Sequence, residues 1–173
     1  IKSKRSRIEI NGRLRIDKNI SKLCKGTTKI ILDEGATLII NGKVTLGPGV
    51  SIYVGKNAKL IINNNTYITG ESKIYCKNYI EIGENCAISF NVVIMDSDLH
   101  NIWIKDEIIN KDKPVIIKNN VWIGCNVTIL KGSIIDDGAI VGAGSIVNKY
   151  INSNCIAAGN PCRIIMDNIY KWR

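Results

Sequence analysis

Residues 117–159 read IKNNVWIGCNVTILKGSIIDDGAIVGAGSIVNKYINSNCIAAG, and this stretch repeats a pattern every six residues. An aliphatic residue returns at each sixth position, namely Ile117, Ile123, Ile129, Ile135, Val141 and Val147. Four places after each comes a small or β-branched residue: Val121, Val127, Ser133, Ala139, Ser145 and Ile151. A period of six is neither the period of an α-helix (about 3.6) nor that of an ordinary strand (about 2). The pattern predicts a parallel β-helix, in which each unit forms one flat face and one corner and three units close a triangular coil.

The residues between the aliphatic positions and the overall composition agree with this prediction. Gly, Asn and Asp recur between the repeats, which suits tight corners and backbone with positive φ. The chain of 173 residues is 45% hydrophobic but only 6% aromatic, so its core has to consist of Ile, Val, Leu and Ala. Repeated aliphatic side chains stack into continuous columns at little cost in rotamer freedom. We therefore expect one all-β domain.

The six-fold period divides the chain into segments. We expect coils over residues 37–94 and 115–159, with slips of phase in the first of these. Residues 1–36 show aliphatic alternation without a clear six-fold phase, and we expect an irregular cap that covers the open end of the coil. Residues 95–114, MDSDLHNIWIKDEIINKDKP, contain no repeat unit and are expected to leave the coil at one corner. Long loops that interrupt a regular fold often carry function.

The end of the chain is expected to close the stack. Asn160 and Pro161 predict a turn that stops the repeats. In the tail, residues 160–173, Ile165, Ile169 and Trp172 recur at the spacing of one helical face. We therefore expect a short C-terminal helix that folds back over the last coil.

Positive charge is concentrated near the N-terminus. Residues 1–29 hold ten Lys and Arg against Glu9 and Asp17, a local net charge of +8 within a total of +9. One interpretation is a solvated first coil whose charge prevents its edge from pairing with other sheets. The other is a patch for an anionic surface, such as lipid headgroups or an acidic glycan. Nucleic acid is not expected as a partner, because no aromatic residue in this run could stack a base.

The six cysteines do not suggest disulfides or a metal site. Cys76, Cys86, Cys125 and Cys155 fall within repeat units and no CxxC pair occurs, so we expect reduced thiols and a cytoplasmic protein. No metal-ligand spacing is present. We expect neither a membrane-spanning segment nor a secretory leader.

The single histidine, His100, lies in the excursion at residues 95–114. A solitary loop histidine is commonly only a solvated side chain, but Asp96 and Asp98 lie within four residues and could orient or polarise its imidazole. The excursion is also the segment that interrupts the six-residue repeat. Since no GxSxG motif is present, His100 is the candidate for proton transfer.

The repeats resemble a known family. The stretch NNVWIGCNVTILKGSIIDDGAIVGAGSIVNKYI, followed by AAGNPCRII, is similar to the hexapeptide-repeat acyltransferases, most of all the sugar O-acetyltransferases of the galactoside, maltose, nodulation-factor and capsule type. The likeness is strong over residues 82–165, and the order VWIG, GAGSIV, AGNP is specific for the family. It implies a left-handed parallel β-helix, a homotrimer, and active sites between neighbouring subunits. It also implies acetyl-CoA as acyl donor, no metal, and a sugar or glycan acceptor.

The resemblance assigns roles to individual residues. His100 would take the proton from an acceptor hydroxyl, which then attacks the thioester directly without an acyl-enzyme. Asn91, Asp98 and Trp122 would contact the acceptor, although Trp122 could equally be an aromatic residue packed between subunits. A general base, the role assigned to His100, contributes on the order of 10²–10⁴ in rate. The developing oxyanion needs a backbone N–H, which Gly124 or Cys125 could supply.

The donor would lie along residues at the corners of the last coils. The motif places Cys125, Ala143 and Asn148 along the pantetheine, and Gly142 keeps that wall flat. Lys149 and Arg163 would meet the phosphates. The chain departs from the family at Met166, where a basic residue is common, so phosphate binding there would fall to Arg163 or Lys171.

The sequence argues against some related activities and leaves others open. The γ-type carbonic anhydrases need three histidines per zinc site, more than one histidine per chain provides between two subunits. We expect neither the helical domain of serine acetyltransferases nor a nucleotidyltransferase domain. Antibiotic or amino-sugar acetyltransferases and a non-enzymatic β-solenoid stay open. The pattern identifies neither the acceptor and its hydroxyl, nor the length of the acyl group, nor the role of residues 1–29.

Overall fold

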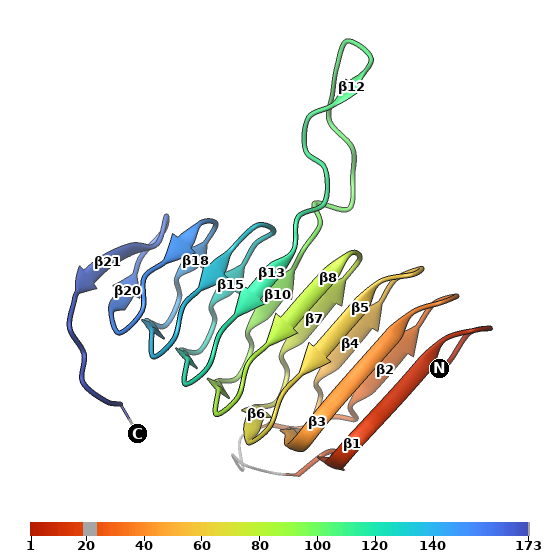
Figure 1. Cartoon of the computed structure of the whole chain (residues 1–173), viewed down its shortest axis with the longest axis horizontal. Coiled ribbons are helices and arrows are strands. Elements are labelled where there is room, and N and C mark those ends of the chain that lie inside the picture. Colours follow the sequence, from red (N-terminus) through yellow and green to blue (C-terminus); the bar gives the residue numbers. More distant parts are fainter. Residues whose placement is uncertain (19–23, 173) are drawn as a thin grey trace.

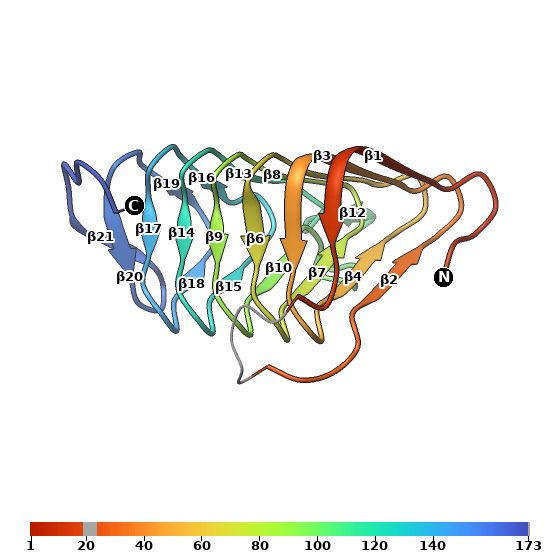
Figure 2. The same cartoon turned by 90° about the horizontal axis from the view of Figure 1, so that it is seen from below.

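The computed structural model describes residues 1–18 and 24–172. Two basic residues, Lys22 of the N-terminal run and Arg173 of the tail, lie outside the described residues. The described chain winds as a long three-sided coil, with β1 (Arg7–Arg15) at one end and β21 (Arg163–Met166) at the other (Figures 1 and 2). The predicted all-β parallel coil is confirmed. None of the described residues form a helix, so this part of the chain has none that could cross a membrane.

The strands pair in parallel along three faces. The first face contains β3 (Thr37–Leu46), β5 (Lys59–Ile62), β8 (Tyr79–Ile82), β13 (Val115–Ile117), β16 (Ile134–Ile135) and β19 (Tyr150–Ile151). The second face takes the end of β3 and then β6 (Thr66–Ile68), β9 (Ala87–Ile88), β14 (Trp122–Ile123), β17 (Ile140–Val141) and β20 (Ile156–Ala158). The third face contains β2 (Lys29–Leu32), β4 (Ser51–Val54), β7 (Lys73–Cys76), β10 (Val93–Met95), β15 (Thr128–Ile129) and β18 (Ile146–Val147).

The register stacks the six-fold aliphatic residues directly above one another. On the second face Ile123 lies between Ile88 and Val141, and on the third face Ile129 lies between Ile94 and Val147. These side chains are buried and form one continuous core cluster. Stacked aliphatic columns exclude water along the whole coil, and this burial is the main stabilising term of the fold.

The corners explain the recurring Asn and Gly. Asn residues at corners have φ between 51° and 58°, and include Asn57, Asn65, Asn85, Asn91, Asn120, Asn126 and Asn154. Asn tolerates this left-handed region better than other residues with a side chain. Gly124 is needed for a different reason, because a Cβ there would lie 2.6 Å from the backbone nitrogen of Ala143 in the next coil.

The two ends of the chain differ from our expectations. Strand β1 (Arg7–Arg15) pairs in parallel with β3 over its whole length, and β2 joins the third face. The described residues of 1–36 thus continue the coil in regular parallel register and do not form an irregular cap. Ile8 and Ile10 stack on Leu38 and Ile40 but are 40% and 49% exposed, because β1 is the last strand at this end. At the other end, β21 (Arg163–Met166) pairs antiparallel with β20. The predicted C-terminal helix is wrong, because the open edge of β20 offers backbone groups that an added strand satisfies.

The excursion forms a hairpin that stands clear of the coil (Figure 1). The chain leaves the third face after β10 and rejoins the first face at β13. Between them, β11 (Trp103–Ile104) and β12 (Glu107–Ile108) pair antiparallel. Trp103 and Ile104 are each 57% exposed. The hairpin therefore presents apolar side chains away from the body of the molecule.

Candidate functional site

The base of the hairpin is anchored by Asp96, which is fully buried. Its carboxylate accepts hydrogen bonds from the backbone N–H groups of Lys77, Asn78 and Tyr79, at 2.7, 2.7 and 2.8 Å. These amides form the corner between β7 and β8. Our expectation that Asp96 orients His100 is therefore wrong, since its oxygens are committed to this corner. Asp96 instead fixes where the excursion leaves the coil.

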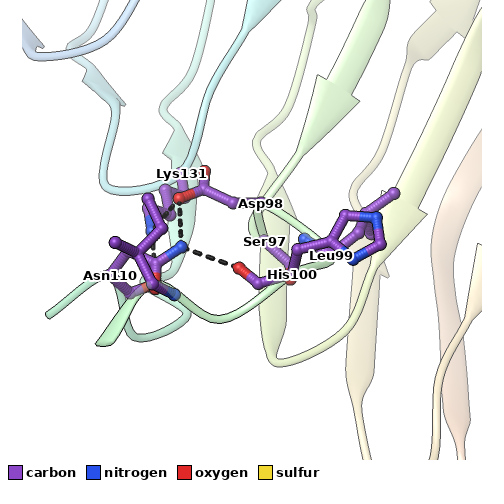
Figure 3. Close-up of polar contacts among 7 residues, drawn as sticks. Ser97, Asp98, Leu99, His100, Asn110 and Lys131 are labelled. Atoms are coloured by element: carbon purple, nitrogen blue, oxygen red, sulfur yellow. Dashed lines mark hydrogen bonds and ion pairs between the residues drawn. The ribbon is translucent and has the colours of Figure 1, made fainter. Parts of the chain in front are cut away.

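Asp98 forms the next contact, with a residue from the adjacent coil. Its Oδ2 lies 2.5 Å from Lys131 Nζ and accepts a hydrogen bond of 2.9 Å from Asn110 Nδ2 (Figure 3). Lys131 belongs to the corner after β15 and its side chain is only 15% exposed. Hydrogen bonds from Lys131 and then Asn110 lower the pKa of the Asp98 carboxyl. Asp98 is thus held as an anion against the body of the coil.

His100 itself is exposed and lies on the near part of the hairpin. Its ring points away from the Asp98 carboxylate, while its carbonyl oxygen accepts a hydrogen bond from Asn110 Nδ2 (Figure 3). Neither Asp96 nor Asp98 therefore orients the imidazole directly, because both carboxylates bind other groups. The residue before it, Leu99, has φ +66°, a conformation that is costly for a bulky side chain. The imidazole is free to meet a group outside its own coil.

Four of the predicted residues gather along the corner between the second and third faces. Asn91 Nδ2 donates to Asn126 Oδ1 in the next coil, at 2.7 Å. One coil further, the Gly144 N–H donates to the carbonyl of Cys125. Gly142 and Ala143 directly precede that contact, and a Cβ on Gly142 would lie 2.9 Å from the Cβ of Ala158. The sequence motif thus produces one continuous edge with small exposed residues.

The two candidate oxyanion donors differ in availability. The N–H of Gly124 donates to the carbonyl of Val141 at 2.8 Å, as part of the second face. Among the described residues, the N–H of Cys125 has no such acceptor. The Cys125 thiol is free and partly exposed. Of the two amides that the sequence left open, Cys125 is therefore the one that can still donate.

Trp122 lies at the start of β14 on the second face, 41% exposed and two residues after the corner at Asn120. Its ring faces that of Trp172 from the C-terminal tail, with ring centres 5.8 Å apart. The indole N–H of Trp172 donates to the carbonyl of Asn120. A groove of about 470 Å³ runs along the tail at this side, lined by the tail and by corner asparagines such as Asn85 and Asn154. Of the residues predicted for the site, Lys171, the alternative phosphate contact, lines that groove, whereas Trp122 only adjoins it through Trp172.

The predicted phosphate-binding cations lie near the C-terminal end of the coil. Asn148 and Lys149 follow β18 at the corner between the third and first faces, and Arg163 begins β21. Burial raises the pKa of the Cys162 thiol, and the charges of Lys149 and Arg163 partly offset that rise. Both cations therefore act on the same small region. Both are exposed, as binding of a phosphate from solvent requires.

Within one chain these groups do not form a single pocket. His100 emerges at the corner between the third and first faces, whereas Trp122, Cys125 and Ala143 lie on the second face or its far corner.

Sequence reasoning also missed Asn110 and Lys131, which hold the segment around His100. No short motif could have found them, because Lys131 lies 33 positions after Asp98. Among the described residues, no cluster of three or more His, Cys, Asp or Glu could hold a metal ion.

Comparison with known proteins identifies the repeats. Residues 114–149 match the family model described as bacterial transferase hexapeptide (six repeats). The galactoside O-acetyltransferase of Escherichia coli (strain K12) is 35% identical over 119 residues, which cover 67% of this chain and 58% of that protein. The polysialic acid O-acetyltransferase of Escherichia coli O1:K1 / APEC is 37% identical over 121 residues, which cover 68% of this chain and 39% of that protein. The chain thus spans about half the length of these two relatives.

A solved structure agrees with the sequence matches. The crystal structure of the polySia specific acetyltransferase NeuO superposes with a TM-score of 0.72 and 29% identity, over 100% of this chain and 87% of that one. The predicted resemblance and the left-handed coil are thereby confirmed. Residues 114–149 carry the bacterial transferase hexapeptide repeats, and the chain is a left-handed β-helical relative of the hexapeptide-repeat acetyltransferases.

Proposed function

We propose that this protein is an acetyl-CoA-dependent O-acetyltransferase that acts on a sugar hydroxyl, in the synthesis of a surface polysaccharide or glycoconjugate. The observation that carries the proposal is the single histidine on a hairpin that interrupts a hexapeptide coil. Relatives named as galactoside and polysialic acid O-acetyltransferases support a sugar acceptor. Their greater length leaves the acceptor open, since part of each lies outside the matched region.

The chemistry requires a base and an oxyanion donor. A sugar hydroxyl is a poor nucleophile, so its proton has to leave as the new C–O bond forms. The His100 imidazole takes this proton, and the hydroxyl oxygen bonds to the acyl carbon. The C–S bond then breaks, and the imidazolium returns the proton to the departing thiolate, so that CoA leaves as a thiol. The acyl oxygen, on which negative charge develops, accepts a hydrogen bond from the N–H of Cys125. Cys125 is preferred to Gly124 because the N–H of Gly124 is already bonded to Val141.

The arrangement favours a site shared between copies of the chain. His100 and the edge formed by Cys125 and Ala143 lie at different corners of one coil. Two copies side by side can bring the hairpin of one against that edge of the other. Three copies around a three-fold axis give three equivalent sites, so we propose a homotrimer. The exposed Trp103 and Ile104 support this, because contact with a neighbour would bury them.

Acetyl-CoA fits the residues along the donor edge, which is the edge formed by Cys125, Gly142 and Ala143. Gly142 and Ala143 leave that edge without bulky side chains, so an extended chain can lie close to the backbone. Asn148 would contact the pantetheine. Lys149 and Arg163 supply positive charge for the phosphates at the end of the coil.

Asn91 and Trp122 are proposed to contact the acceptor from the same side. Trp122 is exposed and offers an aromatic face to a sugar ring, while Asn91 has a side-chain amide that can bind hydroxyl groups. Asp98 was the third predicted acceptor contact. Its carboxylate is bonded to Lys131 and Asn110, and we assign it to the hairpin instead.

The setting of the protein is part of the same proposal. The thiols of Cys24, Cys76, Cys125, Cys155 and Cys162 are free, which agrees with the reducing cytoplasm where acetyl-CoA would be the donor. The described basic residues of 1–29 lie at the β1 end of the coil, remote from the donor edge. We propose that they approach an anionic membrane surface.

The test is an acetyl-transfer assay with a panel of acceptors. Purified protein, acetyl-CoA and a thiol-detecting dye should release CoA in the presence of a sugar or oligosaccharide acceptor. His100→Ala should lower kcat by about 10²–10⁴. Asn101→Ala, an exposed neighbour on the same segment, should leave kcat unchanged. Turnover of a drug or an amine alone would contradict the acceptor class, and no binding of acetyl-CoA would favour a non-enzymatic solenoid.

A further inference from the structure

The segment that carries His100 is held from both sides by one amide. Asn110 Nδ2 donates to the carbonyl of His100 at 2.8 Å, and Asn110 Oδ1 accepts from the N–H of Ile102 at 2.6 Å. The same Nδ2 also donates to Asp98 Oδ2. This side chain uses both its amide nitrogen and its amide oxygen, and two of its three bonds fix the backbone on either side of Asn101. An amide in this role sets the direction in which the histidine leaves the backbone.

Lys131 connects this amide to the body of the coil. Its ammonium group contacts Asp98 Oδ2 and donates to the backbone carbonyl of Asn110, both at 2.5 Å. Lys131 comes from the corner after β15, one coil beyond the excursion, and its side chain is mostly buried. A charged group held at two points with little exposure gives a better-defined geometry than an exposed ion pair. The hairpin base is therefore tied to a rigid element and not only to itself.

The backbone just before His100 indicates why such support is needed. Leu99 has φ +66° although its side chain is large and apolar, and its N–H donates to Ser97 Oγ at 3.0 Å. Residues in this region persist only when surrounding contacts hold them there, and such residues gather at functional sites. Without Asn110 and Lys131 this turn would relax, and the imidazole would leave its present position.

We propose that Asn110 and Lys131 are positioning residues for His100, with Asp98 as the anion that joins them. This inference rests on the proposed function, because it concerns the base of that reaction. Neither residue touches the acceptor or the thioester. They act by holding the histidine where a neighbouring copy of the chain can present its donor edge.

The experiment compares Lys131→Met and Asn110→Ala with wild type and with His100→Ala. Met keeps the apolar length of Lys but removes the charge. We expect kcat to fall by at least about tenfold in both variants, because a displacement of about 1 Å can cost far more than that. The KM for acetyl-CoA should stay unchanged. Lys131→Arg should recover most of the activity, and Lys56→Met, which breaks an exposed lysine–glutamate pair near β4, serves as the matched control.

A second readout does not depend on turnover. His100 is the only histidine, so its imidazole gives a single set of signals in the NMR spectrum of the labelled protein. We expect one sharp set in wild type and in Lys56→Met, and shifted or broadened signals in Lys131→Met and Asn110→Ala. In a double-mutant cycle, Asp98→Asn should add little to Lys131→Met, because both remove the same contact.

The outcomes separate the two proposals. Inactive His100→Ala together with fully active Lys131→Met and Asn110→Ala would overturn the positioning role and leave the proposed reaction in place. Unchanged His100 signals in both variants would also overturn it. If His100→Ala keeps full activity, both proposals fail.

Discussion

Replacing Asp96 tests how the hairpin is attached to the coil. Its buried carboxylate accepts three backbone N–H bonds of 2.7–2.8 Å from one corner. Asp96→Ala leaves all three donors without their acceptor, and each buried unsatisfied group costs about 1–3 kcal/mol. Because local relaxation and water recover part of this, we expect a loss of about 3–6 kcal/mol. At about 2–4 °C per kcal/mol for a chain of this size, Tm should fall by about 6–24 °C.

A second substitution at Asp96 should give a smaller loss of stability than Asp96→Ala. Asp96→Asn can keep the two bonds that Oδ2 accepts, from Asn78 and Tyr79, but turns an N–H₂ toward the N–H of Lys77. Its cost should be about a third to a half of that of Asp96→Ala. Urea unfolding followed by circular dichroism measures both, with Asp106→Asn at the exposed hairpin tip as control. A loss below about 1 kcal/mol for Asp96→Ala would refute the reasoning.

Three further changes probe the coil and the hairpin base. Gly124→Ala should lower the free energy of unfolding by about 1–3 kcal/mol and lower kcat, because its Cβ would meet the backbone of the next coil. Thermal unfolding measures the first effect and the acetyl-transfer assay the second. Ile123→Ala should cost about 2–5 kcal/mol in urea unfolding, whereas Ile134→Ala, on an exposed side chain, should cost far less. The Asp98 pKa is lowered, so its bond to Lys131 stabilises the fold above the ordinary carboxyl pKa of about 3.9 and is lost as pH falls through the folded value. The stability difference between wild type and Asp98→Asn should therefore be present at pH 7 and vanish in strong acid.

The regular part of the fold could be predicted because one physical rule generates it. Inward positions are aliphatic and most left-handed corners of the coil are Asn or Gly, so the register of Ile123 and Val141, which are three repeats apart, follows from spacing alone. The N-terminal residues obey a looser rule. Strand β1 runs past a corner, where a Cβ on Gly12 would lie 2.2 Å from the carbonyl oxygen of Gly42, and the period of six is lost there.

The remaining features depend on contacts that spacing does not encode. In the tail, Ile165, Ile169 and Trp172 fit one face of a helix, but the open edge of β20 binds β21 instead. The hairpin could be placed from the break in the repeats, and His100 within it. The contacts of Asn110 and Lys131 that support His100 join separate coils, so spacing could not reveal them. Asp96 and Asp98 are close to His100 in sequence and therefore suggested the wrong partners for its imidazole.

The central claim is that His100 of one copy acts at the donor edge of another, and mixing of two inactive variants tests it most directly. His100→Ala lacks the base, and Ala143→Trp blocks the proposed donor edge at an exposed position. When the two are co-assembled in equal amounts, about one quarter of shared sites combine an intact histidine with an intact edge. We predict that CoA release recovers to roughly that fraction of the wild-type rate. A mixture that stays as inactive as each variant alone, although mixed oligomers form, would contradict the account.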